Sequence, residues 1–593
     1  MSHTPLFDAI RRTLAYLELS KRTGRPIEDI QQSLLLEKEK DVKLGISRRE
    51  FLYGIGTLTA TSLLPKFFSA SLKSFQVPRI AIIGSGIAGL SAGLTLKDAG
   101  VPFTIYEAST GRVGGRMLSE GKLIGPGCGA CHPVSDEQHT VFLEGQVADI
   151  FAEGIDRDNP TILSLARRFG LPLINQVAAA PAGTNETFYF FNQYYPYEDA
   201  MRDFSPLLDV IKEDLQVTGY PTTYNKSTPE GRALDTMSAY DWIESRVPGG
   251  HASQLGAFLE VVIANEYGAE TSVQSSLNPI YFLGYIFGLL STSAQPPSPW
   301  PSNYIRMILG MRGSEKYKIR GGVERLPKAI ADHLGMDSVI KMGWMLEAIA
   351  KNPDGTYTLS FYNSQSVVAD MVLLALPFSA FVNFDYSLAG FDDLKCKAIR
   401  EQGQAHNSKL QLQFNRRYWN ELGPWGRSEG TMWSDTDVQN TWDATLGQPG
   451  NCGILVGYNG AHATDALYLK HSYGNIFSFN EVTTDAQVFL QEIEKIFPGI
   501  SPYWNGRAIE TISHLNPLVR TSFAYYGKGQ YQSFAGYERV RQGAVFFAGE
   551  HTSIDYLGLM EGAAAEGIRA GKEILETVGA HSLTNSFRAQ SIS

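Results

Sequence analysis

Three glycines recur at short spacing in the segment Gly84-Ser85-Gly86-Ile87-Ala88-Gly89, which follows the apolar run from Arg79 to Ile83. The first glycine permits a tight turn, the second lets the backbone approach a ligand, and the third allows a helix to pack closely on a strand. The next segment, Leu90 to Ala99, has a helical pattern, and the N-terminus of a helix attracts negative charge. These residues therefore have the composition and spacing of a loop that binds a pyrophosphate.

An acidic residue follows at the distance that such a loop requires. The run Val101 to Tyr106 predicts a second strand, which ends at Glu107 and Ala108. A carboxylate about 20 residues after the glycines accepts the hydroxyl groups of an adenosine ribose and disfavours a 2′-phosphate. The order of strand, glycine turn, helix, strand and acid thus predicts a βαβ unit that binds a dinucleotide.

Two further glycine-rich segments carry charge. Gly111-Arg112-Val113-Gly114-Gly115-Arg116-Met117 offers two guanidinium groups, which suit a ligand buried along its length. Near the other end of the chain, the apolar run Val545 to Ala548 predicts a buried strand that leads to Gly549 and Glu550. A helix with small residues then begins near Gly558-Leu559-Met560, and its N-terminus could stabilise negative charge on a reduced flavin.

A lysine lies on a separate predicted strand. The segment Ser408 to Phe414 alternates polar and apolar residues, which indicates a strand that carries Lys409 near its start. The usual environment of a strand lysine is solvent, and spacing alone favours that interpretation.

Length and composition limit the class of protein. A chain of 593 residues is too long for one hydrophobic core, so two or more domains are expected. Hydrophobic residues (43%) and charged residues (19%) are present in globular proportions, and the 58 glycines show no triplet period. The net charge of −10 argues against nucleic acid as a partner, and four cysteines exclude a disulfide scaffold.

The N-terminal part of the chain contains an export-like pattern. Ser47-Arg48-Arg49-Glu50-Phe51-Leu52 resembles a bacterial twin-arginine signal, and the apolar segment after it is too short to span a membrane. We therefore expect a periplasmic or secreted protein without stable membrane insertion. An arginine pair at the end of an ordinary amphipathic helix is the alternative, and Ser69-Ala70-Ser71 is only a weak cleavage site, so removal of the segment stays open.

A cysteine motif follows the second glycine-rich segment. Cys128-Gly129-Ala130-Cys131-His132 matches the pattern of haem attachment, but the surrounding segment of about 26 residues is too short to enclose a haem. A disulfide between Cys128 and Cys131, or two free thiols, is the favoured interpretation.

Taken together, these motifs resemble the flavin-containing amine oxidases, most closely the bacterial L-amino acid oxidases. The resemblance extends from about Arg79 to Leu575 and includes Arg320-Gly321-Gly322 and the strand Met371 to Leu376 before Pro377. It implies an α/β (α+β two-domain) fold, in which a Rossmann-like FAD-binding domain is split in sequence by an inserted substrate-binding domain. The expected divisions are an N-terminal helical extension (1–46), a signal segment (47–75), an FAD-binding domain (77–147, 315–385 and 505–578), a substrate-binding domain (148–314 and 386–504) and a tail (579–593).

The resemblance also implies roles for the cofactor residues. Glu107 would bind the adenosine ribose, Arg116 would lie near the flavin and Glu550 would bind the ribityl chain. Members with covalent FAD use a cysteine in the C-terminal region, whereas the last cysteine here is Cys452, so we expect non-covalent FAD. No metal site is predicted. The expected cofactor-binding residues are Gly84, Gly86, Ala88, Gly89, Glu107, Ala108, Gly114, Gly115, Arg116, Gly549, Glu550 and Met560.

On the substrate side, Lys409 is similar to the family lysine that holds a water molecule at flavin N5, and we expect it to be catalytic. Glu153 lies in a segment similar to one in bacterial L-amino acid oxidases and polyamine oxidases and could face a substrate amino or guanidinium group, although a solvated loop position is equally compatible. The next residue, Gly154, stands where venom-type L-amino acid oxidases carry an arginine that binds the substrate carboxylate. The remaining substrate-side predictions are Tyr458 for the carboxylate, the Gly558 carbonyl for the amine, and Leu559 and Trp442 as cavity walls; Tyr458 and Trp442 are also compatible with plain core packing.

The expected activity is that of an FAD-dependent L-amino acid oxidase. An L-amino acid, O2 and water would give a 2-oxo acid, ammonia and hydrogen peroxide, after hydride transfer from the α-carbon to flavin N5. An amine or polyamine oxidase is the alternative, supported by Glu153 and the missing arginine. A flavin-bearing protein without turnover is a third possibility. We expect small-molecule partners and, by analogy with the family, a homodimer or higher homo-oligomer.

Overall fold

The computed structural model describes residues 78–120, 141–286, 289–290 and 316–590. The expected N-terminal extension, the export-like segment and the Cys128–His132 motif lie outside these ranges. Within them, no helix combines the length and the apolar content needed to cross a membrane.

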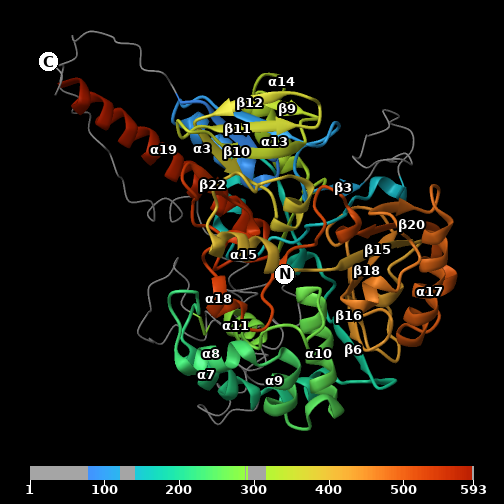
Figure 1. Cartoon of the computed structure of the whole chain (residues 1–593). Helices are drawn as coiled ribbons and strands as arrows, with labels where there is room; N and C mark the ends of the chain where they lie inside the picture. Colours follow the sequence, from blue (N-terminus) through green and yellow to red (C-terminus); the bar gives the residue numbers. More distant parts are fainter. Residues whose placement is uncertain (1–77, 121–140, 287–288, 291–315, 591–593) are drawn as a thin grey trace, which may run out of the picture.

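The first part of the fold is built on a five-stranded parallel sheet (Figure 1). Its spatial order is β22 (Val545–Phe547), β13 (Met371–Leu374), β1 (Ile80–Ile83), β2 (Thr104–Glu107) and β9 (Ile340–Met342). The strands β1, β13 and β22 are buried along their whole length, as expected for a parallel sheet covered on both faces. This sheet therefore joins segments from the two ends and the middle of the described chain.

Two helices pack against each other beside this sheet. The first, α3 (Ile87–Asp98), follows the glycine turn, and the second, α19 (Met560–Gln590), begins close to the cofactor-like motifs and extends beyond the sheet (Figure 1). A β-carbon added at Gly567 would lie 2.1 Å from the Ala88 carbonyl oxygen, so glycine is required for this close approach. The small residues of the predicted C-terminal helix thus serve helix packing.

A small antiparallel sheet adjoins the parallel one. It consists of β10 (Leu346–Lys351), β11 (Tyr357–Phe361) and β12 (Ser366–Ala369). The rings of Tyr106 on β2 and Phe361 on β11 have centroids 4.9 Å apart, so a shared aromatic core joins the two sheets.

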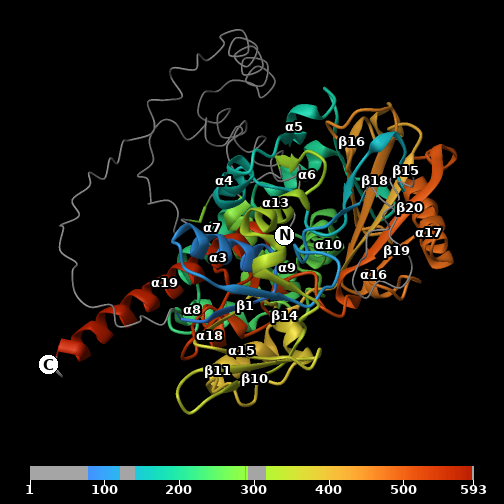
Figure 2. The ribbon, with the colours of Figure 1, turned by 90° about the horizontal axis from the view of Figure 1, so that it is seen from above.

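The second part of the fold contains an eight-stranded mixed sheet, visible beside the first part in both views (Figures 1 and 2). The helix α17 (Asn480–Ile496) packs on its outer side. The strand order is β19 (Tyr473–Asn475), β20 (Trp504–Ile512), β15 (Asn407–Phe414), β18 (Gly453–Gly460), β17 (Asn440–Asp443), β16 (Ser428–Ser434), β6 (Asn185–Phe190) and β7 (Gln193–Tyr194).

Helices fill the end of this part that lies far from the parallel sheet (Figure 1). One of them, α10, contacts β6, β16 and β18 and buries Phe258 against aromatic residues of the sheet. The helix α11, which contains Tyr281, is buried almost throughout. The bounds are α7 (Leu207–Thr218), α8 (Pro229–Thr236), α9 (Ala239–Arg246), α10 (Gln254–Tyr267) and α11 (Leu277–Ile286).

The observed architecture is the expected mixed α/β fold in two parts, and the order of β1, α3 and β2 confirms the predicted βαβ unit. The helix begins at Ile87 rather than Leu90, because Gly86 has extended backbone angles and occupies the N-cap. The expected domain change at residue 505 falls inside β20, which pairs with β15 in the eight-stranded sheet.

Candidate active site and cofactor cavity

A single long cavity brings together residues from both parts of the fold. Four strands of the parallel sheet (β1, β2, β13 and β22) end at its wall, which is the edge of an α/β sheet where ligands bind. Of the predicted site residues, Gly89 and Ala108 do not line it. The predicted residues that do are Gly84, Gly86, Ala88, Glu107, Gly114, Gly115, Arg116, Glu153, Lys409, Trp442, Tyr458, Gly549, Glu550, Gly558, Leu559 and Met560.

The glycine turn leaves room for a ligand at one position and packs tightly at another. A β-carbon added at Gly86 would meet no atom within 4 Å, whereas one at Gly89 would lie 2.0 Å from the Gly84 carbonyl oxygen. The second glycine loop is fixed beside the first, because the Gly114 N–H donates to the Ser85 carbonyl oxygen over 2.9 Å. The open space at Gly86 and the N-terminus of α3 fit a pyrophosphate.

Hydrogen bonds fix the carboxylate of Glu107 next to the glycine turn. One of its oxygens accepts hydrogen bonds from the Ser85 N–H (2.8 Å) and the Ser85 hydroxyl (2.6 Å), and the other accepts from the Ser109 N–H (2.8 Å). These contacts fix the carboxylate where it lines the cavity, beside the glycine loop.

An ion pair between a partly buried arginine and a buried glutamate joins the second glycine loop to the C-terminal motif. Arg116 Nη1 lies 2.8 Å from Glu550 Oε1 and also donates to the Ser522 carbonyl oxygen over 2.7 Å. The other Glu550 oxygen accepts from the Gly558 N–H over 2.9 Å. Burial alone would raise the pKa of Glu550, but the charge and hydrogen bond of Arg116, together with His551 and the Gly558 N–H, lower the pKa below its ordinary value. Glu550 is therefore an ionised group at the end of β22.

Lys409 is buried in an ionic cluster, not exposed to solvent. Its Nζ lies 2.5 Å from Glu153 Oε2, and the side chain is only 7% exposed. The same carboxylate also contacts the ammonium group of Lys318 and accepts a hydrogen bond from Trp442 Nε1 over 2.9 Å. Two lysines and one indole thus share one glutamate.

Neighbouring charges shift the pKa values of two carboxyl groups in this region, Glu153 and Asp149. Burial would raise the pKa of Glu153, but the two ammonium groups lower it well below its ordinary value. The pKa of Asp149 is raised by burial and by the charge of Glu153, although Ser119 and the Val323 N–H donate hydrogen bonds to its carboxyl group. Glu153 is therefore the ionised partner of the lysines.

This arrangement changes the interpretation of Glu153. The residue lines the cavity, as predicted, but its oxygens contact the lysines and the indole, so they are not open toward a substrate amino group. Lys318 was not among the predicted site residues; it lies on β8 (Tyr317–Ile319), far from Glu153 in the chain. A lysine between the apolar residues Tyr317 and Ile319 was the one local sign that it is buried.

Aromatic residues form the wall next to Lys409. Tyr458 is its cross-strand neighbour on β18, and Lys409 Nζ lies 5.0 Å from the centre of the Trp442 ring. The rings of Trp442 and Tyr458 meet nearly edge to face, with centroids 5.5 Å apart. Gly558 and Leu559 line the same cavity from the segment that leads to α19.

The strand β15 is held in place by its polar face. Successive residues on that face, Lys409, Gln411 and Gln413, all bind the segment 143–153: the Gln411 amide donates to the Asp149 carbonyl oxygen and the Gln413 amide to Gln146 Oε1. The alternation predicted for this strand is therefore present, but both of its faces are buried.

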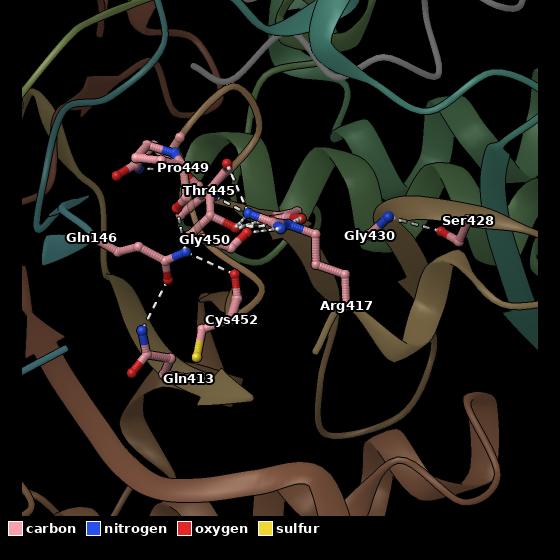
Figure 3. A network of polar contacts seen from close by, with 12 residues as sticks. Gln146, Gln413, Arg417, Ser428, Gly430, Thr445, Pro449, Gly450 and Cys452 are labelled. Atoms are coloured by element: carbon pink, nitrogen blue, oxygen red, sulfur yellow. Dashed lines mark hydrogen bonds and ion pairs between the residues drawn. The ribbon is translucent and has the colours of Figure 1, made fainter. Parts of the chain in front are cut away.

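The far end of β15 is tied to the loop between β17 and β18 (Figure 3). The Gln146 amide donates to the carbonyl oxygens of Pro449 (3.2 Å) and Cys452 (2.7 Å) and accepts from Gln413 (2.9 Å). In the same network Arg417 donates to Thr445 Oγ1 over 2.9 Å. These contacts fix the register of the strand that carries Lys409.

Proteins similar to this chain are found among oxidases of amino acids and amines. The chain is 25% identical over 513 residues to an L-amino-acid oxidase of Siganus canaliculatus, with 84% of this chain and 85% of that protein covered. It is 22% identical over 534 residues to polyamine oxidase 2 of Arabidopsis thaliana, covering 85% of this chain and 90% of that protein.

The fold is similar to that of cyclohexylamine oxidase from Brevibacterium oxydans IH-35A, with a TM-score of 0.65 and 19% identity. The match covers 85% of this chain and 100% of that structure. A family model described as flavin containing amine oxidoreductase matches residues 87–575. The chain therefore belongs to the family of flavin-containing amine oxidoreductases.

Proposed function

We propose that this oxidoreductase is an FAD-dependent L-amino acid oxidase. The observation that carries the proposal is the burial of Lys409, held by Glu153, in the same cavity as the glycine turn, Glu107 and the Arg116–Glu550 pair. One cavity thus offers a dinucleotide cradle and a positioned ammonium group beside it.

The residues present fit FAD. The open space at Gly86 suits the pyrophosphate, and the Glu107 carboxylate at the cavity wall suits the adenosine ribose. When bound, FAD would accept a hydride from the α-carbon of the substrate and return electrons to O2, which gives hydrogen peroxide. Non-covalent binding is supported by the two described cysteines, Cys396 and Cys452, neither of which lines the cavity.

Lys409 has the contacts needed to hold a water molecule. An ammonium group has three N–H donors, and Lys409 Nζ uses two acceptors, Glu153 Oε2 at 2.5 Å and the Asp149 carbonyl oxygen at 3.3 Å. A third donor can hold a water molecule in the cavity, where a positive charge stabilises negative charge that develops during oxygen reduction. The aromatic pair of Trp442 and Tyr458 would bound the substrate on this side.

An amine or polyamine oxidase is the second candidate. The observation that favours it is that the two arginines lining the cavity, Arg112 and Arg116, are both engaged in contacts with the protein. The first donates to the Met117 carbonyl oxygen and the second pairs with Glu550, while Gly154 brings no guanidinium group. A substrate carboxylate would then depend on Tyr458. The similarity to a polyamine oxidase is consistent with this alternative.

Oxygen consumption with a substrate panel tests the proposal. We expect turnover of L-amino acids with release of hydrogen peroxide and ammonia, and little turnover of putrescine, spermidine or tyramine. Turnover of the unmodified amines alone would favour the second candidate. In the Lys409→Met variant we expect peroxide formation to fall by about 100-fold, whereas Lys397→Met, at an exposed helix position, should leave it unchanged. Equal rates in the two variants would remove Lys409 from the mechanism.

We also propose export through the twin-arginine-like segment. It is supported by Arg48-Arg49 and the short apolar stretch after them. Replacing both arginines with lysine should retain the protein in the cytoplasm of a bacterial host, as measured by cell fractionation. Unchanged export of that variant would contradict the proposal.

A further inference from the structure

A second, smaller cavity adjoins the proposed flavin cavity, and Leu559 lines both of them. Its volume of about 70 Å³ gives room for a small polar group but not for a second substrate molecule. Its walls come from α11, from α18 (Gln530–Phe534), from the segment after α7 and from the segment before α19. The helices α11 and α18 lie close together in Figure 1. The cavity therefore lies where the helices of the second part of the fold meet the segment that joins β22 to α19.

Tyrosine rings form a large share of the described wall of this cavity. The rings of Tyr281 and Tyr531 meet edge to face, with centroids 5.6 Å apart, and the rings of Tyr526 and Tyr531 have centroids 4.4 Å apart. Contacts of this kind fix the rings against one another. The tyrosines that line the cavity are Tyr220, Tyr267, Tyr281, Tyr285, Tyr526 and Tyr531.

The hydroxyl groups of four of these tyrosines bind protein atoms. Tyr267 donates to the carbonyl oxygen of Asn278, and Tyr531 donates to the side-chain oxygen of the same residue, both over 3.0 Å. Tyr281 and Tyr526 likewise donate to side-chain oxygens, over 2.8 Å and 2.9 Å. What these residues offer to a ligand is therefore the aromatic ring, and the π electrons of a tyrosine ring attract cations.

Asp555 is the one charged residue in the described lining. Its Oδ1 accepts a hydrogen bond from the Tyr220 hydroxyl over 3.4 Å. A carboxylate has about four acceptor positions, so it can bind a donor of a ligand in addition to its contacts within the protein. The segment that carries it is held in place, because the Tyr556 N–H donates to Ser553 Oγ over 3.1 Å and the Leu559 N–H to the Tyr556 carbonyl oxygen over 3.2 Å. The cavity thus combines one positioned carboxylate with aromatic rings.

The surroundings of this carboxylate favour a cation over an uncharged apolar group. Burial raises the pKa of Tyr556, and four negative charges act in the same direction, to about 12; they belong to Glu561, Asp555, Asp158 and Asp156. An apolar group in the cavity would displace water from Asp555 without replacing its hydrogen bonds, which is unfavourable. An ammonium or guanidinium group replaces them and also contacts the rings.

We propose that this cavity is a side-chain subsite that binds the ammonium or guanidinium group of a basic L-amino acid, and that Asp555 determines this specificity. The reacting end of the substrate would occupy the main cavity with Lys409, and its side chain would extend along Leu559, which the two cavities share. Glu153 does not fill this role, because its oxygens contact two lysines and an indole. The inference rests on the proposed oxidase function and narrows its substrate class to amino acids such as L-lysine and L-arginine.

Oxygen consumption by the flavin-loaded full-length protein with matched pairs of substrates tests the subsite without any substitution. L-Arginine and L-citrulline are nearly equal in size but differ in side-chain charge, and L-lysine and L-norleucine form a second such pair. We expect kcat/KM to be at least about tenfold higher for the charged member of each pair. Equal or higher values for the neutral members would overturn the subsite and leave the proposed oxidase function standing. Absence of turnover with every L-amino acid would instead contradict the proposed function, and the inference with it.

Substitution of the carboxylate tests the role of Asp555 itself. In Asp555→Asn we expect the KM for L-arginine to rise by about tenfold or more with kcat little changed, while L-norleucine keeps its KM within about twofold. The control Asp158→Asn removes a half-buried acid near the same Tyr556, but Asp158 lines neither cavity, so this variant should keep the KM of the parent protein.

The flavin spectrum verifies that each variant is folded, and Asp555→Glu, which keeps the charge, should retain the preference for L-arginine over L-citrulline. An unchanged KM for L-arginine in Asp555→Asn would overturn the proposal. An equal rise of this KM in Asp158→Asn would also overturn it, because the effect would then come from the general negative charge of the region.

Discussion

Glu153 connects the buried charges of the site, because its carboxylate contacts Lys318, Lys409 and the indole of Trp442. Its lowered pKa keeps it ionised, and each of the three charged side chains is at most 7% exposed. Buried charges are tolerated only while they are paired, since an unpaired charge keeps the full cost of leaving water. Replacing Glu153 should therefore lower the free energy of unfolding more than replacing one of the lysines.

Replacing Glu153 with alanine removes the carboxylate that both buried ammonium groups contact. We expect a loss of about 3–5 kcal/mol in the free energy of unfolding. Lys318→Met keeps the Glu153–Lys409 pair and should lose about 1–3 kcal/mol. Urea unfolding followed by tryptophan fluorescence measures both, with Lys397→Met as the exposed control. If Glu153→Ala unfolds at the same urea concentration as the control, the three charges do not act as a unit.

His551 should make the protein sensitive to mild acid. Burial lowers its pKa to about 3 in the folded state, whereas an unfolded histidine titrates near 6.5. Between these values the unfolded chain binds a proton and the folded chain does not, so stability falls as pH decreases below about 6.5. The slope for one proton is about 1.4 kcal/mol per pH unit.

The Tm at pH 7, 6 and 5 measures this contribution. The decrease in Tm toward pH 5 should be smaller in His551→Phe than in the parent protein. His462→Phe, whose histidine is 79% exposed, should follow the parent. If the Tm of His551→Phe and of the parent fell equally between pH 7 and pH 5, the folded protein would bind a proton at His551 as readily as the unfolded chain does.

The elements that could be predicted from the sequence are those with a local signal. The βαβ unit follows from glycines, an apolar run and an acid close together in the chain, and β15 follows from its alternation. The strands β9 and β20 belong to sheets formed by distant segments, and their positions depend on pairing that no local pattern encodes. Lys318 was missed for the same reason, since its partner Glu153 is close only in the fold.

The packing of α3 against α19 gives a prediction at the scale of elements. A side chain at Gly567 would meet the Ala88 carbonyl oxygen, so Gly567→Leu should separate the helices and cost about 1–3 kcal/mol. Because Ala88 lines the cavity, flavin content should fall as well. In the same helix, a β-carbon at the exposed Gly579 meets no atom within 4 Å, and Gly579→Ala should stabilise by about 0.8–1 kcal/mol. Thermal unfolding and the ratio of flavin to protein absorbance measure both, and equal effects of the two substitutions would contradict this packing.

At the scale of the whole molecule, the proposed flavin site is assembled from segments far apart in sequence. The wall includes Gly86 after β1, Glu107 at the end of β2, Pro377 after β13 and Glu550 after β22, and the opposite part of the cavity includes Lys409 on β15. A ligand that contacts all of these would connect both parts of the fold, so its free energy of binding would add to the free energy of folding.

Removal of the cofactor should therefore lower the free energy of unfolding and make both parts of the fold more sensitive to proteolysis. If FAD is bound without a covalent bond, acid precipitation should leave all of the flavin in the supernatant, identified by its mass. Restoring FAD to about 100 times its Kd should recover about 2.7 kcal/mol of stability and raise the Tm. It should also slow proteolysis in both parts of the fold, since the cavity walls come from both. Flavin that remains with the precipitated chain would exclude non-covalent binding. Protection of the parallel-sheet part alone would show that the ligand does not connect the two parts.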